Sequence, residues 1–143
     1  MQVLYTASAL ATGDGRDGHV RTSDGTVDLD LAVPKEMGGT GGAANPEQLF
    51  AAGYAACFHS ALRLVARRAK ADVSGSVVEA EVGIGPNGDG GFGLTVALLV
   101  DLPAVERTAA EQLVEAAHQV CPYSNATRGN IKVALTVREA AAA

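Results

Sequence analysis

Hydrophobic and polar residues alternate with the two-residue period of half-buried strands at residues 19–22, 26–33 and 131–137, and further runs are rich in residues that favour strands. The predicted strands cover residues 3–10, 19–22, 26–33, 73–84, 92–100 and 131–137. Over residues 45–70 and 105–120, apolar side chains instead recur every three to four positions, as on one face of a helix. The predicted order is therefore three strands, a helix, two strands, a helix and a last strand.

This order predicts an α+β domain of the form βββ-α-ββ-α-β, because the strands come in hairpins and do not alternate with helices. Turn-forming residues at 23–25 and 85–91 join neighbouring strands into two antiparallel hairpins. A length of 143 residues is that of one ordinary domain, so we expect residues 1–143 to fold as a single domain.

The first predicted helix has an explicit start. Asn45 is a suitable N-cap, Pro46 fits the first helical position, and Gln48 can complete a capping box. The apolar stripe that follows consists of Phe50, Tyr54, Cys57, Ala61, Leu64 and Val65. The corresponding stripe of the second helix consists of Ala109, Leu113, Ala116, Ala117 and Val120. Small residues surround Cys57, so we expect its inward-facing thiol to lie where backbone or a ligand approaches closely.

The net charge of −5 comes from 11 basic and 16 acidic residues. The basic residues are scattered, except for Arg63, Arg67, Arg68 and Lys70 at the end of the first predicted helix, where the helix dipole favours cations. We therefore expect no nucleic acid as a partner. The N-terminus has no basic leader with an apolar core, and the apolar run at residues 49–58 is shorter than the roughly 20 residues that span a bilayer. We expect a cytoplasmic protein that does not bind a membrane.

The two cysteines, Cys57 and Cys121, lie on different predicted helices. A reducing compartment disfavours a permanent disulfide between them. If the helices pack together, the Cα atoms can reach the roughly 4.4–6.8 Å that a disulfide needs, which allows a catalytic or redox pair. Alternatively, both thiols are small buried side chains without chemistry. The residues alone leave both interpretations open.

A reactive Cys57 needs a positive neighbour, because the thiolate is the nucleophile and apolar burial raises the thiol pKa. Arg16 in its glycine-rich loop is the best candidate, and Glu47 can hold its guanidinium. However, Glu47 precedes Cys57 by ten residues, roughly 15 Å along a helix. Either Arg16 spans this gap, or the helix breaks near Gly53, or Glu47 comes from a second chain. We favour the last arrangement, a site assembled across a dimer interface.

Cys57 with His59, and His118 with Cys121, suggest zinc ligation as an alternative. Residues two apart point about 200° from each other around a helix, so Cys57 and His59 diverge and we expect no metal site. His118 is three residues from Cys121 and can form a hydrogen bond near it, but we favour a helix-surface or capping role. A cysteine hydrolase would need a base beside Cys57, and no His or Asp has an obvious spacing for that role.

Two long motifs give a more specific indication. NPEQLFAAGYAACF at residues 45–58 and VCPYSNATRGNI at residues 120–131 closely resemble the organic hydroperoxide resistance proteins of the OsmC-like superfamily. The resemblance covers essentially the whole chain and includes GRDG at residues 15–18 and VPKEMGGTGG at residues 33–42. His59 departs from the aliphatic residue expected there; because it points away from Cys57, we expect it to change packing or polarity and not the chemistry.

The resemblance implies an OsmC-like fold with two central helices, flanking antiparallel sheets and an intertwined homodimer. By position, Cys57 matches the peroxidatic cysteine and Cys121 the resolving cysteine. Arg16 and Glu47 match the pair that activates the thiolate.

The mechanism that the resemblance implies is that of a thiol peroxidase. The Cys57 thiolate reduces an organic hydroperoxide to an alcohol and becomes a sulfenic acid, which condenses with Cys121 to a disulfide. Dihydrolipoyl groups on lipoylated proteins re-reduce this disulfide, and no metal, haem or flavin is needed. Leu49, Phe50 and Phe92 are candidates to line a pocket for an alkyl tail.

Two other classes of function stay open at this stage. A redox sensor would form the same disulfide but pass the signal to a partner protein without turnover. A non-enzymatic dimer would bind a hydrophobic ligand between its helices and use both cysteines for packing. Catalytic consumption of hydroperoxide distinguishes a peroxidase from a sensor, which would consume it only stoichiometrically. Replacing Cys57 would abolish peroxidase activity but would leave a ligand-binding function intact.

Overall fold

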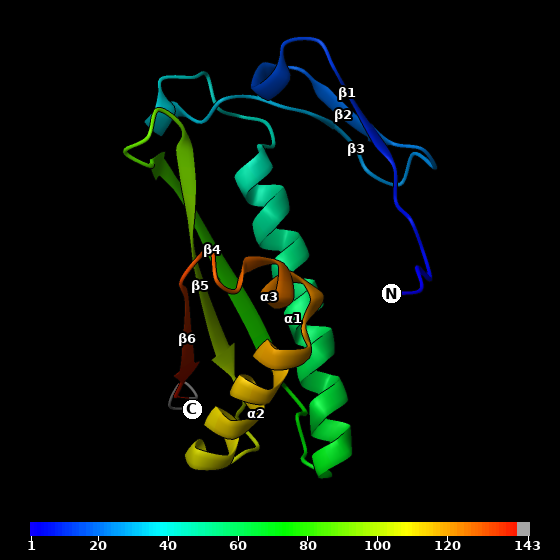
Figure 1. The fold of residues 1–143 in the computed structure, drawn as a ribbon, viewed down its shortest axis with the longest axis vertical. Coiled ribbons are helices and arrows are strands. Elements are labelled where there is room, and N and C mark those ends of the chain that lie inside the picture. Colours follow the sequence, from blue (N-terminus) through cyan, green and yellow to red (C-terminus); the bar gives the residue numbers. More distant parts are fainter. Residues whose placement is uncertain (140–143) are drawn as a thin grey trace. The chain divides into compact units, whose positions relative to one another are not determined.

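The structure is a computed structural model that describes residues 1–139 and divides into two compact units, Met1–Leu49 and the part from Phe50 onward (Figure 1). The first unit contains β1 (Ala9–Thr12), β2 (His19–Thr22), β3 (Asp28–Asp30) and the short 3-10 helices η1 (Gly15–Asp17) and η2 (Lys35–Met37). Helix α1 (Pro46–Ala69) begins in this unit and continues in the second. The second unit also contains β4 (Val77–Pro86), β5 (Phe92–Asp101), α2 (Arg107–Val120), α3 (Pro122–Thr127) and β6 (Val133–Arg138). The α+β class and the order of the main elements are as predicted.

The first unit holds a three-stranded antiparallel sheet in the order β1-β2-β3. The predicted first strand, residues 3–10, is wrong in its extent, because β1 begins only at Ala9. Ala9 lies opposite Thr22, the last residue of β2, so the residues before it have no strand of this sheet to pair with. The third strand is also shorter than predicted, since regular pairing ends at Asp30 and Leu31 makes only an isolated bridge with Ala44.

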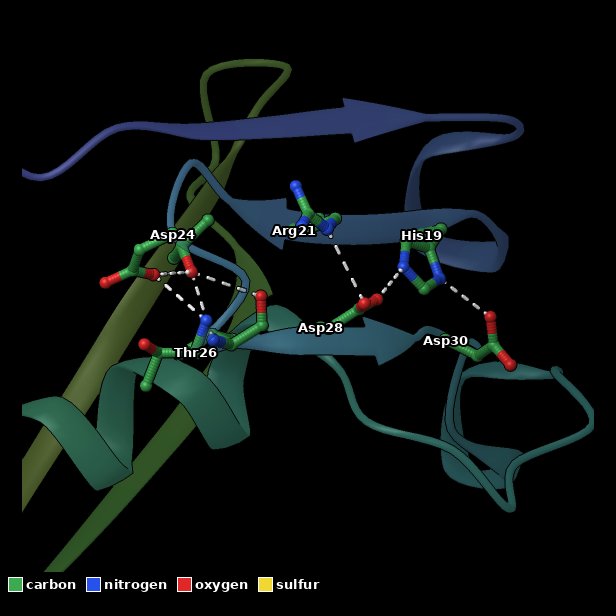
Figure 2. A network of polar contacts seen from close by, with 8 residues as sticks. His19, Arg21, Asp24, Thr26, Asp28 and Asp30 are labelled. Carbon is green, nitrogen blue, oxygen red and sulfur yellow. Dashed lines mark hydrogen bonds and ion pairs between the residues drawn. The ribbon is translucent and has the colours of Figure 1, made fainter.

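Side chains on β2 and β3 tie these two strands together (Figure 2). The imidazole of His19 on β2 lies between two carboxylates of β3, with Nδ1 at 2.8 Å from Asp30 and Nε2 at 2.5 Å from Asp28. Arg21 adds a looser ion pair with Asp28 at 3.6 Å. Cross-strand pairs of opposite charge stabilise a sheet at its surface, and here they add to the apolar pair that Val20 and Leu29 form across the same strands.

Helix α1 starts as the sequence predicts. Asn45 Oδ1 accepts the backbone N–H of Gln48 at 2.9 Å, and Gln48 Oε1 accepts the backbone N–H of Asn45 at 3.2 Å, which completes the capping box around Pro46. By length and composition alone α1 could also cross a membrane, with a mean hydropathy of 1.4. This is weak evidence, because a core helix of a soluble protein has the same properties.

The second unit holds a sheet in the order β4-β5-β6. Strands β4 and β5 form the predicted antiparallel hairpin, with Val77 opposite Asp101 and Pro86 opposite Phe92. The expectation of flanking antiparallel sheets is wrong for the last strand, because β6 pairs with β5 in parallel. Helices α2 and α3 lie between β5 and β6 in the chain. They return the chain to the end of the sheet at which β5 begins, as a parallel connection requires.

The core of the second unit lies between this sheet and the helices α1 and α2. On α1 the buried side chains are Tyr54, Phe58, Ala61, Leu62, Val65 and Ala66. Tyr54, Ala61 and Val65 belong to the predicted stripe, whereas Phe58, Leu62 and Ala66 widen the packed face on one side of it. Cys57 consequently lies at the edge of the core and is only half-buried. On α2 the packed residues are Ala110, Leu113, Val114 and Ala117, whereas the predicted Val120 is exposed.

Candidate active site

The two cysteines meet in the second unit. Cys57 lies in the middle of α1, and Cys121 is the single residue between α2 and α3, fully buried in the core. Their Sγ atoms lie 3.7 Å apart, although the residues are 64 positions apart in the sequence, and both thiols are free. The packing of the helices thus brings one accessible and one buried thiol into contact, which is the arrangement that a redox pair needs.

The surroundings of Cys57 do not by themselves favour a thiolate. Burial raises the pKa of the Cys57 thiol above its ordinary value, and contact with the Cys121 thiol adds to this rise. The backbone N–H of Tyr123 on α3 acts in the opposite direction by donating toward the Cys57 sulfur. A nucleophilic Cys57 therefore needs a cation beyond these neighbours, as the sequence analysis anticipated.

Arg16 and Glu47 form a bidentate ion pair within the first unit. Nη1 of Arg16 donates to Oε2 of Glu47 at 2.8 Å, and Nη2 donates to Oε1 at 2.7 Å. Asp17 steadies the short helix η1 that carries Arg16, since its Oδ1 accepts the backbone N–H of Val33 at 2.9 Å. Glu47 occupies the first turn of α1, where the helix dipole favours a carboxylate.

This ion pair fixes the charge state of both partners. The hydrogen bonds from Arg16 hold the pKa of Glu47 below its usual range, and Glu47 in turn raises the pKa of Arg16. The carboxylate therefore stays ionised and sets the direction of the guanidinium plane. Such a held guanidinium can stabilise a thiolate or a developing oxyanion if either comes within reach.

The structure narrows the three arrangements considered for Arg16, Glu47 and Cys57. Helix α1 is continuous through Gly53, so a break at that position is excluded. The Arg16–Glu47 pair forms inside one chain, so Glu47 need not come from a second chain to hold the arginine. Whether the pair serves the Cys57 of its own chain or that of a second chain stays a prediction.

Three aromatic rings cluster around the turn of α1 that precedes Cys57. The ring of Tyr123 on α3 packs against Phe50 and Tyr54 of α1, with centroid distances of 6.0 and 5.6 Å. Gly53 allows this approach, because a Cβ at that position would lie 2.8 Å from the Tyr123 hydroxyl oxygen. The predicted close approach to α1 is thus made by a side chain of α3. Of the other residues proposed to line a pocket, Phe92 is exposed at the start of β5.

The two histidines suggested as zinc ligands have other partners. Nε2 of His59 lies 2.8 Å from Oγ of Ser76, and Nδ1 of His118 lies 2.8 Å from Oγ of Ser124. Within residues 1–139, no three His, Cys, Asp or Glu side chains are gathered as a metal site would require. The sequence did not single out Tyr123 and Ser124 as site residues; their position just after Cys121 was the available signal.

A family profile described as OsmC-like protein matches residues 39–136 of the chain. The organic hydroperoxide resistance protein of Xanthomonas axonopodis pv. citri is 53% identical over 138 residues, which cover 95% of this chain and 96% of that protein. The organic hydroperoxide resistance protein OhrB of Bacillus subtilis is 46% identical over 138 residues, covering 94% of this chain and 98% of that protein.

Solved structures of organic hydroperoxide resistance proteins are also similar to this chain. A crystal structure of an organic hydroperoxide resistance protein from Legionella pneumophila superposes with a TM-score of 0.91 at 53% identity, covering 95% of this chain and 98% of that one. The crystal structure of OhrB from Bacillus subtilis superposes with a TM-score of 0.86 at 45% identity, covering 95% of this chain and all of that one.

Proposed function

Because this chain belongs to the OsmC-like family, and within it to the organic hydroperoxide resistance proteins, we propose that it is a thiol peroxidase that uses Cys57 and Cys121. At the coarser level, membership of this group makes it a protein of organic hydroperoxide resistance with a peroxide-detoxifying activity. The observation that carries the finer proposal is the contact of two free thiols at 3.7 Å, one half-buried and one fully buried.

In the first step, the Cys57 thiolate attacks the terminal oxygen of an organic hydroperoxide. The O–O bond breaks, two electrons pass from sulfur to the peroxide, and the alkoxide leaves as an alcohol after taking up a proton. Cys57 is left as a sulfenic acid. The aromatic cluster of Phe50, Tyr54 and Tyr123 supplies apolar surface one turn away, which supports a preference for hydroperoxides with an organic tail.

In the second step, the sulfur of Cys121 attacks the sulfur of the Cys57 sulfenic acid. A disulfide forms and the oxygen leaves as water, which also takes the proton of the Cys121 thiol. The two sulfurs must approach from 3.7 Å to the roughly 2.05 Å of a disulfide bond. Only a small shift of the turn between α2 and α3 is needed for this approach.

Arg16 and Glu47 are proposed as the pair that activates the thiolate. Burial raises the pKa of Cys57, so a guanidinium held by a carboxylate supplies the compensating charge. The same guanidinium would stabilise the negative charge that develops on the leaving oxygen. We propose a homodimer as the form in which each pair and each Cys57 are brought together.

The third step restores the thiols. A dithiol attacks the Cys57–Cys121 disulfide, passes through a mixed disulfide and leaves oxidised, so that two electrons and two protons return to the protein. We propose dihydrolipoyl groups on lipoylated proteins as this reductant and the cytoplasm as the compartment. The proposed cycle uses no metal, haem or flavin.

Steady-state reduction of cumene hydroperoxide with a panel of reductants tests the proposal. We expect many turnovers with dihydrolipoamide and few with thioredoxin or glutathione, and none for Cys57→Ser. Consumption limited to one equivalent per chain would favour a sensor. Full function of Cys57→Ser in the cell would favour a non-enzymatic ligand-binding role.

A further inference from the structure

A chain of buried polar side chains lies beside Cys121. Tyr54 and Ser124 are fully buried and Thr127 is 4% exposed. The hydroxyl oxygen of Tyr54 lies 2.8 Å from Oγ of Ser124 and 3.2 Å from Oγ1 of Thr127, and Nδ1 of His118 lies 2.8 Å from the same Ser124 Oγ. Each link engages a donor or an acceptor that burial keeps from water, so the chain restrains all the elements that contribute to it.

Each hydroxyl in this chain has one hydrogen, which determines the direction of every bond. Thr127 donates its hydrogen to the carbonyl oxygen of Ser124 at 3.2 Å, so it accepts from Tyr54. Tyr54 has then used its hydrogen and accepts from Ser124. Ser124 has used its own in turn, so the hydrogen in the remaining bond belongs to His118 Nδ1. The imidazole is therefore the Nδ1–H tautomer.

The chain spans the segment that carries the buried thiol. Tyr54 lies one turn before Cys57 on α1, and His118 lies three residues before Cys121 on α2. Ser124 lies three residues after Cys121, on α3. Cys121 itself is the extended residue between these helices, with φ −65° and ψ 125°. The hydrogen bonds therefore connect both sides of the Cys121 turn to the helix that carries Cys57.

A second set of bonds closes the same turn from its exposed side. Arg128, at the end of α3, donates from Nη2 to the carbonyl oxygen of His118 at 2.5 Å. Its Nη1 donates to Oδ1 of Asn125 at 2.6 Å. The Cys121 turn is thus held at the buried side by Ser124 and at the surface by Arg128.

We propose that Tyr54, Ser124 and His118 are positioning residues that hold the Cys121 turn so that its sulfur meets the sulfur of Cys57. The inference rests on the proposed function, because it assigns these residues to the disulfide-forming step. Among the hydrogen bonds of the described residues, none joins them to either sulfur, so they act through the placement of the turn. Loosening the turn lowers the effective concentration of one thiol at the other.

The equilibrium with dithiothreitol measures this effective concentration without any hydroperoxide. For Tyr54→Phe and Ser124→Ala we expect it to fall roughly tenfold, which raises the disulfide potential by about 30 mV. Tyr5→Phe is the matched control, since it removes the same hydroxyl from a side chain that is 80% exposed in the first unit. An unchanged potential in both network variants overturns the proposal.

Kinetics with one equivalent of cumene hydroperoxide separates the two steps. We expect Ser124→Ala, which leaves the aromatic cluster intact, to form the Cys57 sulfenic acid, trapped with dimedone, at the wild-type rate. It should close the disulfide roughly tenfold more slowly, equivalent to about 1.4 kcal/mol. Slowing of both steps alike contradicts the proposal. If the wild type forms no sulfenic acid, the proposed function fails, whereas the dithiothreitol result still decides the positioning role.

His118 provides a test that does not depend on Tyr54. His118→Asn keeps an N–H donor near the position of Nδ1, so we expect it to restore disulfide closure that His118→Ala slows. Long-range ¹H–¹⁵N correlation spectra of the reduced wild-type protein should show the Nδ1–H tautomer. Observation of the Nε2–H tautomer would overturn the inferred direction of the chain even if every variant failed to fold.

Discussion

Arg16 donates one hydrogen bond to each carboxylate oxygen of Glu47, so the plane of its guanidinium is fixed by a residue in the first turn of α1. The hydrogen bonds keep the pKa of Glu47 low, and the pair therefore persists well into the acidic range. The carboxylate adds no positive charge; it fixes the direction in which the arginine presents its charge. This distinction determines what each substitution should do.

Arg16→Ala should raise the pKa of Cys57, because the proposed stabilising cation is lost while the burial that raises this pKa remains. The peroxidase rate should fall on the order of 100-fold, as for the removal of one group that stabilises developing charge. The pH dependence of Cys57 alkylation by iodoacetamide measures the change. Arg21→Ala, at an exposed arginine on β2, is the control. No upward shift in Arg16→Ala would refute the assigned role.

The two cysteine variants should fail at different points of the cycle. Cys57→Ser should abolish turnover, whereas Cys121→Ser should consume one equivalent of hydroperoxide and stop as a sulfenic acid, which only further equivalents would oxidise to a sulfinic acid. Mass spectrometry of the intact protein after one equivalent distinguishes these products. Sustained turnover of Cys121→Ser with dihydrolipoamide would remove Cys121 from the cycle.

His19 should make the β2–β3 hairpin sensitive to pH. Hydrogen bonds with Asp30 and then Asp28 raise the pKa of His19 above its ordinary value (Figure 2). A raised folded-state pKa means that this stabilisation is fully present below the unfolded value of about 6.5 and is lost as pH rises through the folded-state pKa.

Hydrogen exchange of the β2 and β3 amides, corrected for the intrinsic rate, should therefore show protection that decreases over that interval. Asp30→Asn should lower the pKa of His19, as followed by NMR titration. In His19→Asn, the protection of the β2 and β3 amides should not decrease over this pH interval. A titration of His19 unaffected by Asp30→Asn would contradict the role of this contact.

Replacing a glycine inside a helix by alanine usually stabilises the folded protein by roughly 1 kcal/mol, but Gly53→Ala should not give this gain in stability. The new Cβ would lie 2.8 Å from the Tyr123 hydroxyl oxygen and 3.2 Å from its ring carbons, so the ring must move. In a Tyr123→Ala background the same replacement should stabilise the protein by roughly 1 kcal/mol. Urea unfolding of the four proteins of this cycle measures the coupling, and additive effects would contradict it.

Local features of the fold were predictable because they depend on residues close in the sequence. The capping box of Asn45 and Gln48 and the β4–β5 hairpin need only neighbours within reach of one another. The parallel pairing of β6 was not predictable in this way, since it depends on where α2 and α3 return the chain. The extent of β1 likewise depends on where its partner β2 ends.

The site was predictable to the extent that chemistry restricts it. A reactive buried thiol needs a cation, and this requirement pointed to Arg16 and Glu47, which form an ion pair in the structure. That this pair serves Cys57 stays a prediction. The contact between Cys57 and Cys121 depends on helix packing, and the packed face of α1 includes Phe58 and Leu62, which the predicted stripe left out. Ser124 was not identified, because its position just after Cys121 does not show that its side chain will be buried.

The separation of the two cysteines along the chain also bears on how the protein withstands unfolding. A bond between Cys57 and Cys121 would close a loop of 64 residues and restrict the unfolded chain, which stabilises the folded state by roughly 4 kcal/mol. Under oxidant attack, when other proteins in the cell lose stability, this protein would gain it. The disulfide form that awaits reduction would therefore resist unfolding more than the reduced form.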